Sequence, residues 1–375
     1  SSLRVKILPY PNPFRKGSDD EEEEISILYR DRFAFAVGHG SSASWVNRQH
    51  ECESVSIDFM PTANLKGVIK NPEEMKEMKV LSLQFLADKT ITKESLLTEL
   101  MRFVDVYEDW ITLTTSKLKE IDINGAELAK ERIENKLKVV LQRMRDGVSF
   151  ICSNDNVLES FRLANLSMQM QMIHSSEDFT YPLAEKDYLE DQRWDNRWFP
   201  FQLAFFLLTV ESTSLEEHKD RETVEVLWFP TGGGKTEAYL LLAAFEIIRK
   251  WSESETIGLG TTVIMRYTLQ LLTADQFLRA AKLICALEFI RRQNSNMATT
   301  PITIGLWAGE KVSPNKFIKA REKYQTMLDE DIPETRFQID TCPWCQTKLL
   351  PDTRSRPSDY GFKATNTSFK ILGFS

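Results

Sequence analysis

Cysteine is scarce in this sequence, and no apolar run is long enough to cross a bilayer. The 375 residues include five cysteines, an odd number without pairwise spacing along the whole chain. A disulfide-rich secreted scaffold is therefore excluded, and a reducing compartment is favoured. A membrane helix needs about 20 consecutive apolar residues, and a secretory signal is also missing from the start of the chain. We therefore expect a cytoplasmic protein that makes no contact with a membrane.

An excess of basic residues is absent as well. The formal net charge is -8, from 47 basic and 55 acidic residues, which argues against a protein that is basic over its whole surface. A local basic track for nucleic acid stays compatible with this charge, because net charge averages over surfaces. The remaining composition, 42% hydrophobic and 27% charged residues, is typical of a globular protein of two or three domains.

The most informative stretch is the glycine-rich segment at 231–236. It follows the apolar, β-branched residues 224–228 and precedes residues 237–250, which are rich in good helix formers. A strand, a glycine-rich turn and a helix together form the context of a phosphate-binding loop. Glycines let backbone N–H groups converge on an anion, and the helix start adds the positive end of its dipole. A loop that binds nothing is the plainer alternative, and the register of glycines, lysine and threonine disfavours it.

The residues of this loop have separate expected roles in binding ATP. Lys235 would reach the β- and γ-phosphates and Thr236 would hold Mg²⁺ through its hydroxyl, so these two are the candidate catalytic residues. The other expected contacts to the nucleotide are Thr231, Gly232, Gly233, Gly234 and Glu237. Phe229 stands where the general pattern has a small residue. The loop therefore resembles the first motif of superfamily-two helicases and translocases, in which that leading position is looser.

A candidate adenine-binding element precedes the loop at 197–202. An amide side chain can pair with both the donor and the acceptor of adenine, so we expect Gln202 to contact the base. An aromatic side chain, Trp198 or Phe199, would lie against the ring. The competing interpretation is that Gln202 caps the helix that follows. The aromatic residues around this element lie next to arginines and can stack on bases, although sealing a domain interface is the preferred interpretation.

Two further β-branched segments, 260–266 and 302–307, predict strands that alternate with helices. This order predicts an α/β fold with a RecA-like parallel sheet, an incomplete first motor lobe. Functional loops lie at the carboxyl ends of such strands. Arg266, Thr268 and Thr273 fall there, and their guanidinium and hydroxyl groups suit the phosphate oxygens of nucleic acid. The alternative for Thr273 is a simple helix cap.

The expected division of the chain follows its composition and periodicity. Residues 1–68 alternate apolar and polar positions and predict a β-rich module, whereas apolar spacings of three and four predict a helical domain at 69–180. Residues 181–308 would form the ATP-binding lobe, and residues 309–375 a charged helix with a zinc-ribbon insertion. The acidic run at 19–24 is interpreted as a solvated turn or a helix start.

Cys342 and Cys345 have the spacing of a zinc knuckle. One knuckle supplies two of the four ligands that a structural Zn²⁺ requires, and the other cysteines are scattered. Either the remaining ligands lie beyond this chain or the metal site is degenerate. A redox pair is the less favoured alternative, because the local pattern is that of a ribbon turn rather than a helix start.

An acidic pair at the end of a buried strand, which a working motor needs to hold Mg²⁺, is missing. The acidic residues 329–331 follow a charged helical stretch instead. A second motor domain with an arginine finger is missing too. We therefore expect an N-terminal portion of a larger motor that binds nucleotide but does not hydrolyse it at a useful rate.

Several stretches together resemble the large helicase subunit of the bacterial DISARM anti-phage defence system. They are residues 28–30, 35–40, 160–165, 197–202, 227–240, 265–276, 304–307 and 342–345. This resemblance implies an ATP-dependent helicase or translocase acting on phage DNA, with a second core subunit as partner. The missing acidic motif and second knuckle depart from the pattern. The alternative function is a non-catalytic DNA- or protein-binding scaffold with a vestigial nucleotide loop.

Overall fold

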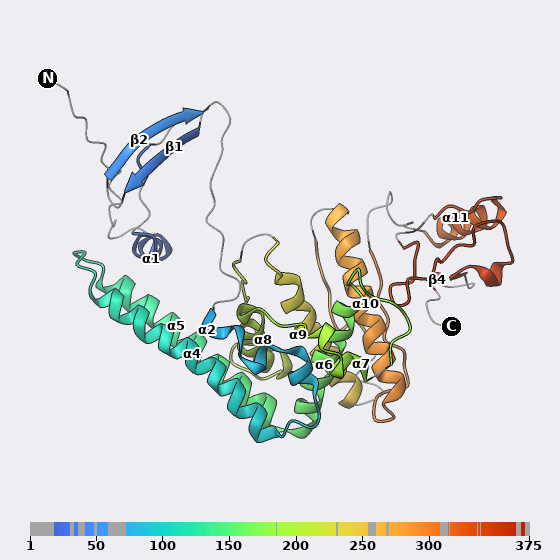
Figure 1. Cartoon of the computed structure of the whole chain (residues 1–375), viewed down its shortest axis with the longest axis horizontal. Coiled ribbons are helices and arrows are strands. Elements are labelled where there is room, and N and C mark those ends of the chain that lie inside the picture. Colours follow the sequence, from blue (N-terminus) through green and yellow to red (C-terminus); the bar gives the residue numbers. More distant parts are fainter. Residues whose placement is uncertain are drawn as a thin grey trace. The chain divides into compact units, whose positions relative to one another are not determined.

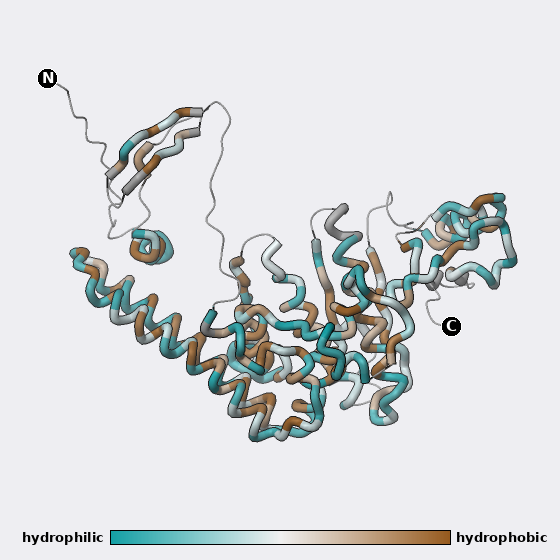
Figure 2. Tube along the Cα trace, viewed as in Figure 1, coloured by the Kyte–Doolittle hydropathy of each residue, from teal (hydrophilic) through white to brown (hydrophobic). Residues whose placement is uncertain are grey.

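The computed structural model divides the chain into two compact units, Ser1–Ile69 with Val104–Arg143, and Lys70–Phe103 with Met144–Ser375 (Figure 1). The residues that it describes are 19–30, 34–36, 42–48, 51–58, 73–184, 186–229, 232–253, 260–267, 270–307, 314, 316–335, 337, 339–364 and 369–371. Helices α4 (Lys93–Lys119) and α5 (Glu127–Ser153) contribute residues to both units. Hydrophobic and hydrophilic residues alternate along these two helices, as expected of amphipathic helices (Figure 2).

The first unit contains the acidic run, which forms helix α1 (Asp20–Leu28). Asp19 caps this helix by accepting a hydrogen bond of 2.7 Å from the backbone N–H of Glu21. The acidic residues of the first turn lie at the positive end of the helix dipole, which stabilises them there. Antiparallel strands β1 (Ser42–Arg48) and β2 (Glu51–Asp58) form a hairpin. The apolar core of the unit joins α1 to α4 and α5 through Ile27, Leu118, Ala126, Ala129 and Ile133.

One face of α1 is held by basic residues of α5 rather than by solvent. Arg132 lies 2.7 Å from a carboxylate oxygen of Glu23 and 3.2 Å from one of Glu24. Lys136 adds an ion pair of 2.7 Å to Glu24. Both glutamates are buried, and such carboxylates require cationic partners to stay charged. The acidic run therefore docks α1 onto the helical hairpin of its own unit.

The second unit is built around α6 (Asp155–Ile173), which packs against α3 (Leu83–Ala87), α9 (Lys235–Glu253) and α10 (Gln270–Gln293) (Figure 1). Helix α8 (Pro200–Ser214) packs against α9. Most of α6 is buried, including polar side chains. Several of those polar groups find partners, as buried groups usually do: the amide oxygen of Asn165 accepts from the indole N–H of Trp198 at 2.9 Å.

The remaining elements are short. They are the helices α2 (Glu73–Lys76), α7 (Asp187–Glu190) and α11 (Phe317–Asp329), the turns η1 (Lys79–Leu81), η2 (Gln192–Trp194) and η3 (Pro357–Asp359), and the antiparallel strands β3 (Phe362–Ala364) and β4 (Phe369–Ile371). Hydrogen bonds from the guanidinium of Arg197 to the backbone oxygens of Lys76 and Met78 tie the predicted adenine element to the α2 region.

The expected RecA-like parallel sheet is wrong for the residues that the structure describes. Their sheets are two antiparallel pairs, β1 with β2 and β3 with β4. Residues 224–228, 261–266 and 302–307 belong to none of these strands. Several of their large apolar side chains are open to solvent, with exposed fractions of 90% for Trp228, 86% for Ile264 and 97% for Trp307, although Ile302 is buried. A parallel sheet requires hydrogen-bonded neighbours and helices on both faces. Here the helices pack on one another instead, so the described fold is predominantly helical.

Candidate functional site

The glycine-rich loop leads directly into α9, which begins at Lys235. Gly232 and Gly234 have φ angles of 74° and 90°, in the left-handed region that favours glycine. A Cβ atom at Gly232 would have no neighbour within 4 Å among the residues that the structure describes, whereas one at Gly234 would lie 2.9 Å from the amide nitrogen of Gln202. Gly233 is buried between them. Thr231 lies outside the described residues. The loop therefore has one open side and one side closed by α8.

The ammonium of Lys235 turns back over the loop and donates a hydrogen bond to the carbonyl oxygen of Phe229. The Phe229 ring stacks on Phe201 with ring centroids 4.0 Å apart, and Phe201 stacks on Phe199 at 6.2 Å. Aromatic stacking of this kind fixes the backbone before the loop against the start of α8. The cation thus lies beside the backbone that a triphosphate would approach.

Gln202 links α8 to the loop. Its amide oxygen accepts from the backbone N–H of Phe199 at 2.8 Å, and its amide nitrogen donates to the carbonyl oxygen of Gly234 at 2.7 Å. The first bond is the helix cap that the sequence offered as the alternative role. Contact with adenine stays a prediction, and it would use the second N–H or lone pair of the amide or replace one of these two bonds.

The two aromatic candidates for the base differ in burial. Trp198 is 1% exposed and belongs to the core beside α6. Phe199 is half-buried, and its ring lies 3.6 Å from the position of a Cβ atom at Gly234. Phe199 therefore lies beside the glycine-rich loop, whereas Trp198 packs in the core against α6.

Two residues that the sequence interpretation missed also touch the start of α9. The hydroxyl of Tyr267 hydrogen-bonds the side chain of Thr236, and burial raises the pKa of this tyrosine. A guanidinium nitrogen of Arg279 lies 2.7 Å from Glu237. Tyr267 stands between two residues that the sequence predicts as DNA contacts, Arg266 and Thr268. The Arg279–Glu237 ion pair joins positions far apart in the chain, so no local sequence pattern could have predicted it.

The predicted DNA contacts are described only in part. Arg266 is exposed. Thr268 lies outside the described residues, and Thr273 lies in α10, where the structure does not describe its side chain. An exposed guanidinium beside Tyr267 is compatible with binding a phosphate oxygen. DNA binding by these residues stays a prediction.

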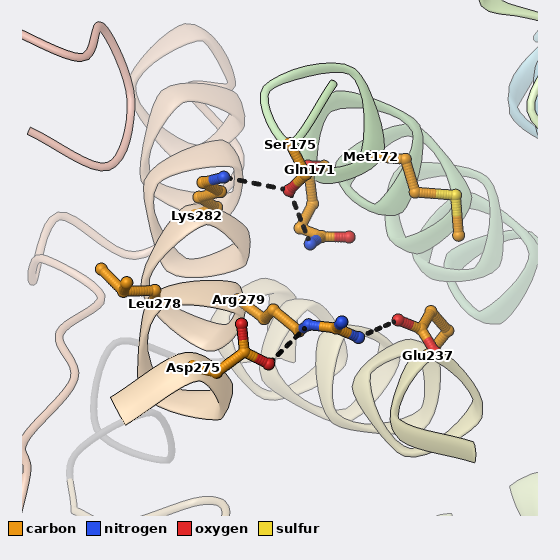
Figure 3. Close-up of a pocket in the computed structure, with 8 residues that line it drawn as sticks. All are labelled: Gln171, Met172, Ser175, Glu237, Asp275, Leu278, Arg279 and Lys282. Atoms are coloured by element: carbon orange, nitrogen blue, oxygen red, sulfur yellow. Dashed lines mark hydrogen bonds and ion pairs between the residues drawn. The ribbon is translucent and has the colours of Figure 1, made fainter. Parts of the chain in front are cut away.

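A hollow of about 340 Å³ lies next to the start of α9, between α6 and α10 (Figure 3). Glu237 forms part of its wall, so the hollow and the glycine-rich loop share the first turn of α9. Side chains of both charge signs line it, together with the apolar side chains of Met172 and Leu278.

Cys342 and Cys345 lie in a tight ribbon turn, as their spacing predicts. The N–H of Cys342 donates to Thr347 at 2.8 Å, and its carbonyl oxygen accepts from Gln346 at 2.9 Å. Gln346 has a φ angle of 60°, a left-handed conformation that closes the turn. Trp344 anchors this turn by stacking on His174, with ring centroids 3.7 Å apart.

A third thiol lies near this turn. Burial, followed by the neighbouring thiols of Cys342 and Cys345, raises the pKa of Cys285 to about 12. Cys285 precedes Phe289 by one turn of α10, and Phe289 packs against Trp344. Even so, the described residues contain no group of three or more His, Cys, Asp or Glu arranged to hold a metal ion. Zinc ligation by Cys342 and Cys345 therefore stays a prediction.

The comparisons with known proteins identify a relative. No protein-family model matches the chain. The sequence is 30% identical over 393 aligned residues to the DISARM protein DrmA of Bacillus paralicheniformis, an alignment that covers 95% of this chain. The chain spans 33% of the length of that protein. Among the described residues, no helix is sufficiently long and apolar to span a bilayer. The resemblance predicted from the motifs is thus confirmed, and the chain is DrmA-like over nearly all of its length.

Proposed function

We propose that this chain forms part of an ATP-dependent DNA helicase or translocase subunit of an anti-phage defence complex. The observation that carries the proposal is the backbone at 232–235, where two left-handed glycines lead into a helix that begins at a lysine. A helix start with N–H groups directed outward is a site for anions. Similarity to a DISARM protein supplies the biological setting.

Lys235 and Thr236 would act on the nucleotide itself. The ammonium of Lys235 would exchange the carbonyl of Phe229 for phosphate oxygens, a stronger charge-assisted contact. Thr236 would exchange Tyr267 for Mg²⁺. The glycine backbone would hold the phosphates, and Gln202 with Phe199 would face the base. Zn²⁺ at Cys342 and Cys345 would have a structural role.

DNA would approach the exposed Arg266 with Thr268 and Thr273. Phage DNA and a second core subunit of the defence complex are the proposed partners, because a DISARM protein acts within a multi-component system. Tyr267 supports this placement, since it connects the proposed DNA segment to Thr236 at the nucleotide.

Titration of the chain with Mg-ATP tests the nucleotide site. We expect Lys235→Ala to weaken binding at least about tenfold, since one charge-assisted contact contributes roughly 1.5–3 kcal/mol. Lys250→Ala removes the same charge from the far end of α9 and should bind as the natural chain does. Equal affinities of the two variants for Mg-ATP would overturn the proposal.

The alternative is a non-catalytic scaffold with a vestigial loop. It is favoured by the bonds that the loop makes within the chain, from Lys235 to Phe229 and from Gln202 to Gly234. Binding of a short DNA duplex separates the two functions. A scaffold binds DNA with the same affinity with and without Mg-ATP, whereas a motor changes its DNA affinity when nucleotide binds.

A further inference from the structure

The hollow between α6, α9 and α10 contains two cations on one face of α10. Arg279 and Lys282 are three residues apart on that helix, so their side chains lie on the same side. Arg279 uses two of its nitrogens on carboxylates, Glu237 at 2.7 Å and Asp275 at 3.2 Å. Figure 3 shows the side chains of Gln171, Arg279 and Glu237 converging from three different helices.

Lys282 differs from Arg279 in its partners. Its ammonium donates to the hydroxyl of Ser175 at 3.2 Å, and no carboxylate among the described residues lies within ion-pair distance of it. Burial, followed by the charge of Arg279, lowers the pKa of Lys282, while Asp275 acts in the opposite direction. A half-buried ammonium with a neutral partner and a cationic neighbour is stabilised by an anion.

The opposite wall presents an unpaired acceptor. Gln171 is 4% exposed, and its amide oxygen has no hydrogen-bond partner in the described part of the chain. Its amide nitrogen is occupied, because it donates to Ser175 at 3.3 Å. A second buried oxygen without a partner among the described residues, on Glu237, lies 3.5 Å from the Cβ position of Gly234, on the side of the glycine-rich loop. Buried acceptors are normally satisfied, so the hollow suits a molecule that brings hydrogen-bond donors as well as negative charge.

We propose that this hollow binds one nucleotide unit, with its phosphate on Lys282 and Arg279 and an O–H or N–H group of the same unit on Gln171. The volume of about 340 Å³ lies at the small end of the range for ligand sites, about 300–1,000 Å³. The hollow shares Glu237 with the first turn of α9, but Lys282, Arg279 and Gln171 are not among the contacts proposed for the glycine-rich loop, so the hollow does not require nucleotide there. The unit comes either from a free nucleotide or from a nucleic-acid strand, because both carry the same phosphate and donor groups.

The test uses the whole chain carrying Lys235→Ala, so that the glycine-rich loop no longer contributes a cation. AMP and a short single-stranded oligodeoxyadenylate are titrated separately. We expect Lys282→Met to weaken binding about tenfold or more, and Lys282→Arg to stay within about threefold of the parent. Lys250→Met, which removes a charge elsewhere in the same unit, should match the parent. Thermal unfolding of each variant shows that the fold is kept.

The two probes distinguish the sources of the nucleotide unit. Loss of AMP binding alone identifies a free nucleotide, and loss of oligonucleotide binding alone identifies a strand. Either result supports the site. The proposal is overturned if neither probe binds, or if Lys282→Met and Lys250→Met bind both probes equally well. Because Lys235 is already replaced, neither outcome affects the separate proposal for the glycine-rich loop.

Discussion

Gln202 is the residue on which α8 and the glycine-rich loop both depend. Its amide oxygen accepts from the backbone N–H of Phe199, and its amide nitrogen donates to the carbonyl oxygen of Gly234. If the loop moved away from the start of α8, a buried polar group would therefore lose its hydrogen bond. The position of Gln202 also sets what residue 234 must be. A side chain there would lie 2.9 Å from the amide nitrogen, closer than two such atoms approach without displacement.

Replacing Gly234 by alanine should therefore cost more than replacing Gly232. Both positions have positive φ angles, so each alanine should lower the free energy of unfolding by about 1–2 kcal/mol through backbone strain. Gly234→Ala should lose about 1 kcal/mol more, because it disrupts a Gln202 hydrogen bond. Urea unfolding of the two variants measures the difference. Equal losses would show that Gln202 does not fix the loop.

His174 should make the stability of the second unit depend on pH. The ring is fully buried, and its nitrogens lie 2.6 Å from the carbonyl oxygen of Trp344 and 2.8 Å from the hydroxyl of Tyr188. Burial lowers the pKa of His174 to about 4, although the bond to Trp344 acts against this. The unfolded chain takes up the proton near pH 6.5, before the folded chain does. Acidification through that window therefore favours unfolding.

Between pH 7.5 and pH 5 we expect His174 to remove about 2 kcal/mol of stability, from the interval between the two pKa values. The His174→Gln variant keeps a hydrogen-bond donor at this position but has no side chain there that takes up a proton. The unfolding free energy of this variant should therefore fall less than that of the parent over the same pH range. Glu288 adds little slope in this range: burial acts to raise its pKa, but hydrogen bonds from Arg291, Ile302 and Arg292 lower it overall from 4.5, so this carboxyl group takes up its proton below pH 5. Parallel slopes for the two proteins would contradict the assignment to His174.

Helix α5 and helix α8 approach each other at a glycine. A Cβ atom at Gly147 would lie 1.9 Å from the carbonyl oxygen of Leu207, so Gly147→Ala must push the two backbones apart. Overpacking of this kind should lower the free energy of unfolding by about 2–3 kcal/mol. Gly305→Ala is the matched control, because no atom of the described residues lies within 4 Å of that Cβ position. Denaturant unfolding that gives the same loss for both variants would contradict this close approach.

The sequence predicted helices correctly, but it predicted a parallel sheet that the described residues do not form. The helix expected at 237–250 and the charged helix expected before residues 329–331 are confirmed as α9 and α11. Their apolar spacing reports directly on which face is buried. Alternation at 224–228 reports only that the backbone is extended. It contains no information about a neighbouring strand, so the step from extended segments to a parallel sheet was wrong.

The candidate site was predictable where its residues are adjacent in the chain. The glycine-rich turn before α9 and the ribbon turn at Cys342 are local patterns, and both are present. The pairs Glu237–Arg279 and Thr236–Tyr267 arise from the packing of α9 with its neighbours. Such pairs depend on the tertiary fold, which a single sequence does not specify position by position.

The chain spans a third of the length of its DISARM relative, and its fold has a consequence that spectroscopy can check. Trp228 and Trp307 stand on extended segments with 90% and 97% of their surface exposed, whereas Trp198 is 1% exposed. Acrylamide should therefore quench the emission of Trp228, Trp307 and the half-exposed Trp110 more strongly than that of Trp198. Trp228→Phe and Trp307→Phe should each remove a quenchable part of the emission, and Trp198→Phe should remove an unquenched part. A sheet covered by helices would shield all three rings from acrylamide. Emission from Trp228 and Trp307 that resists quenching would therefore contradict the exposed, unpaired segments described here.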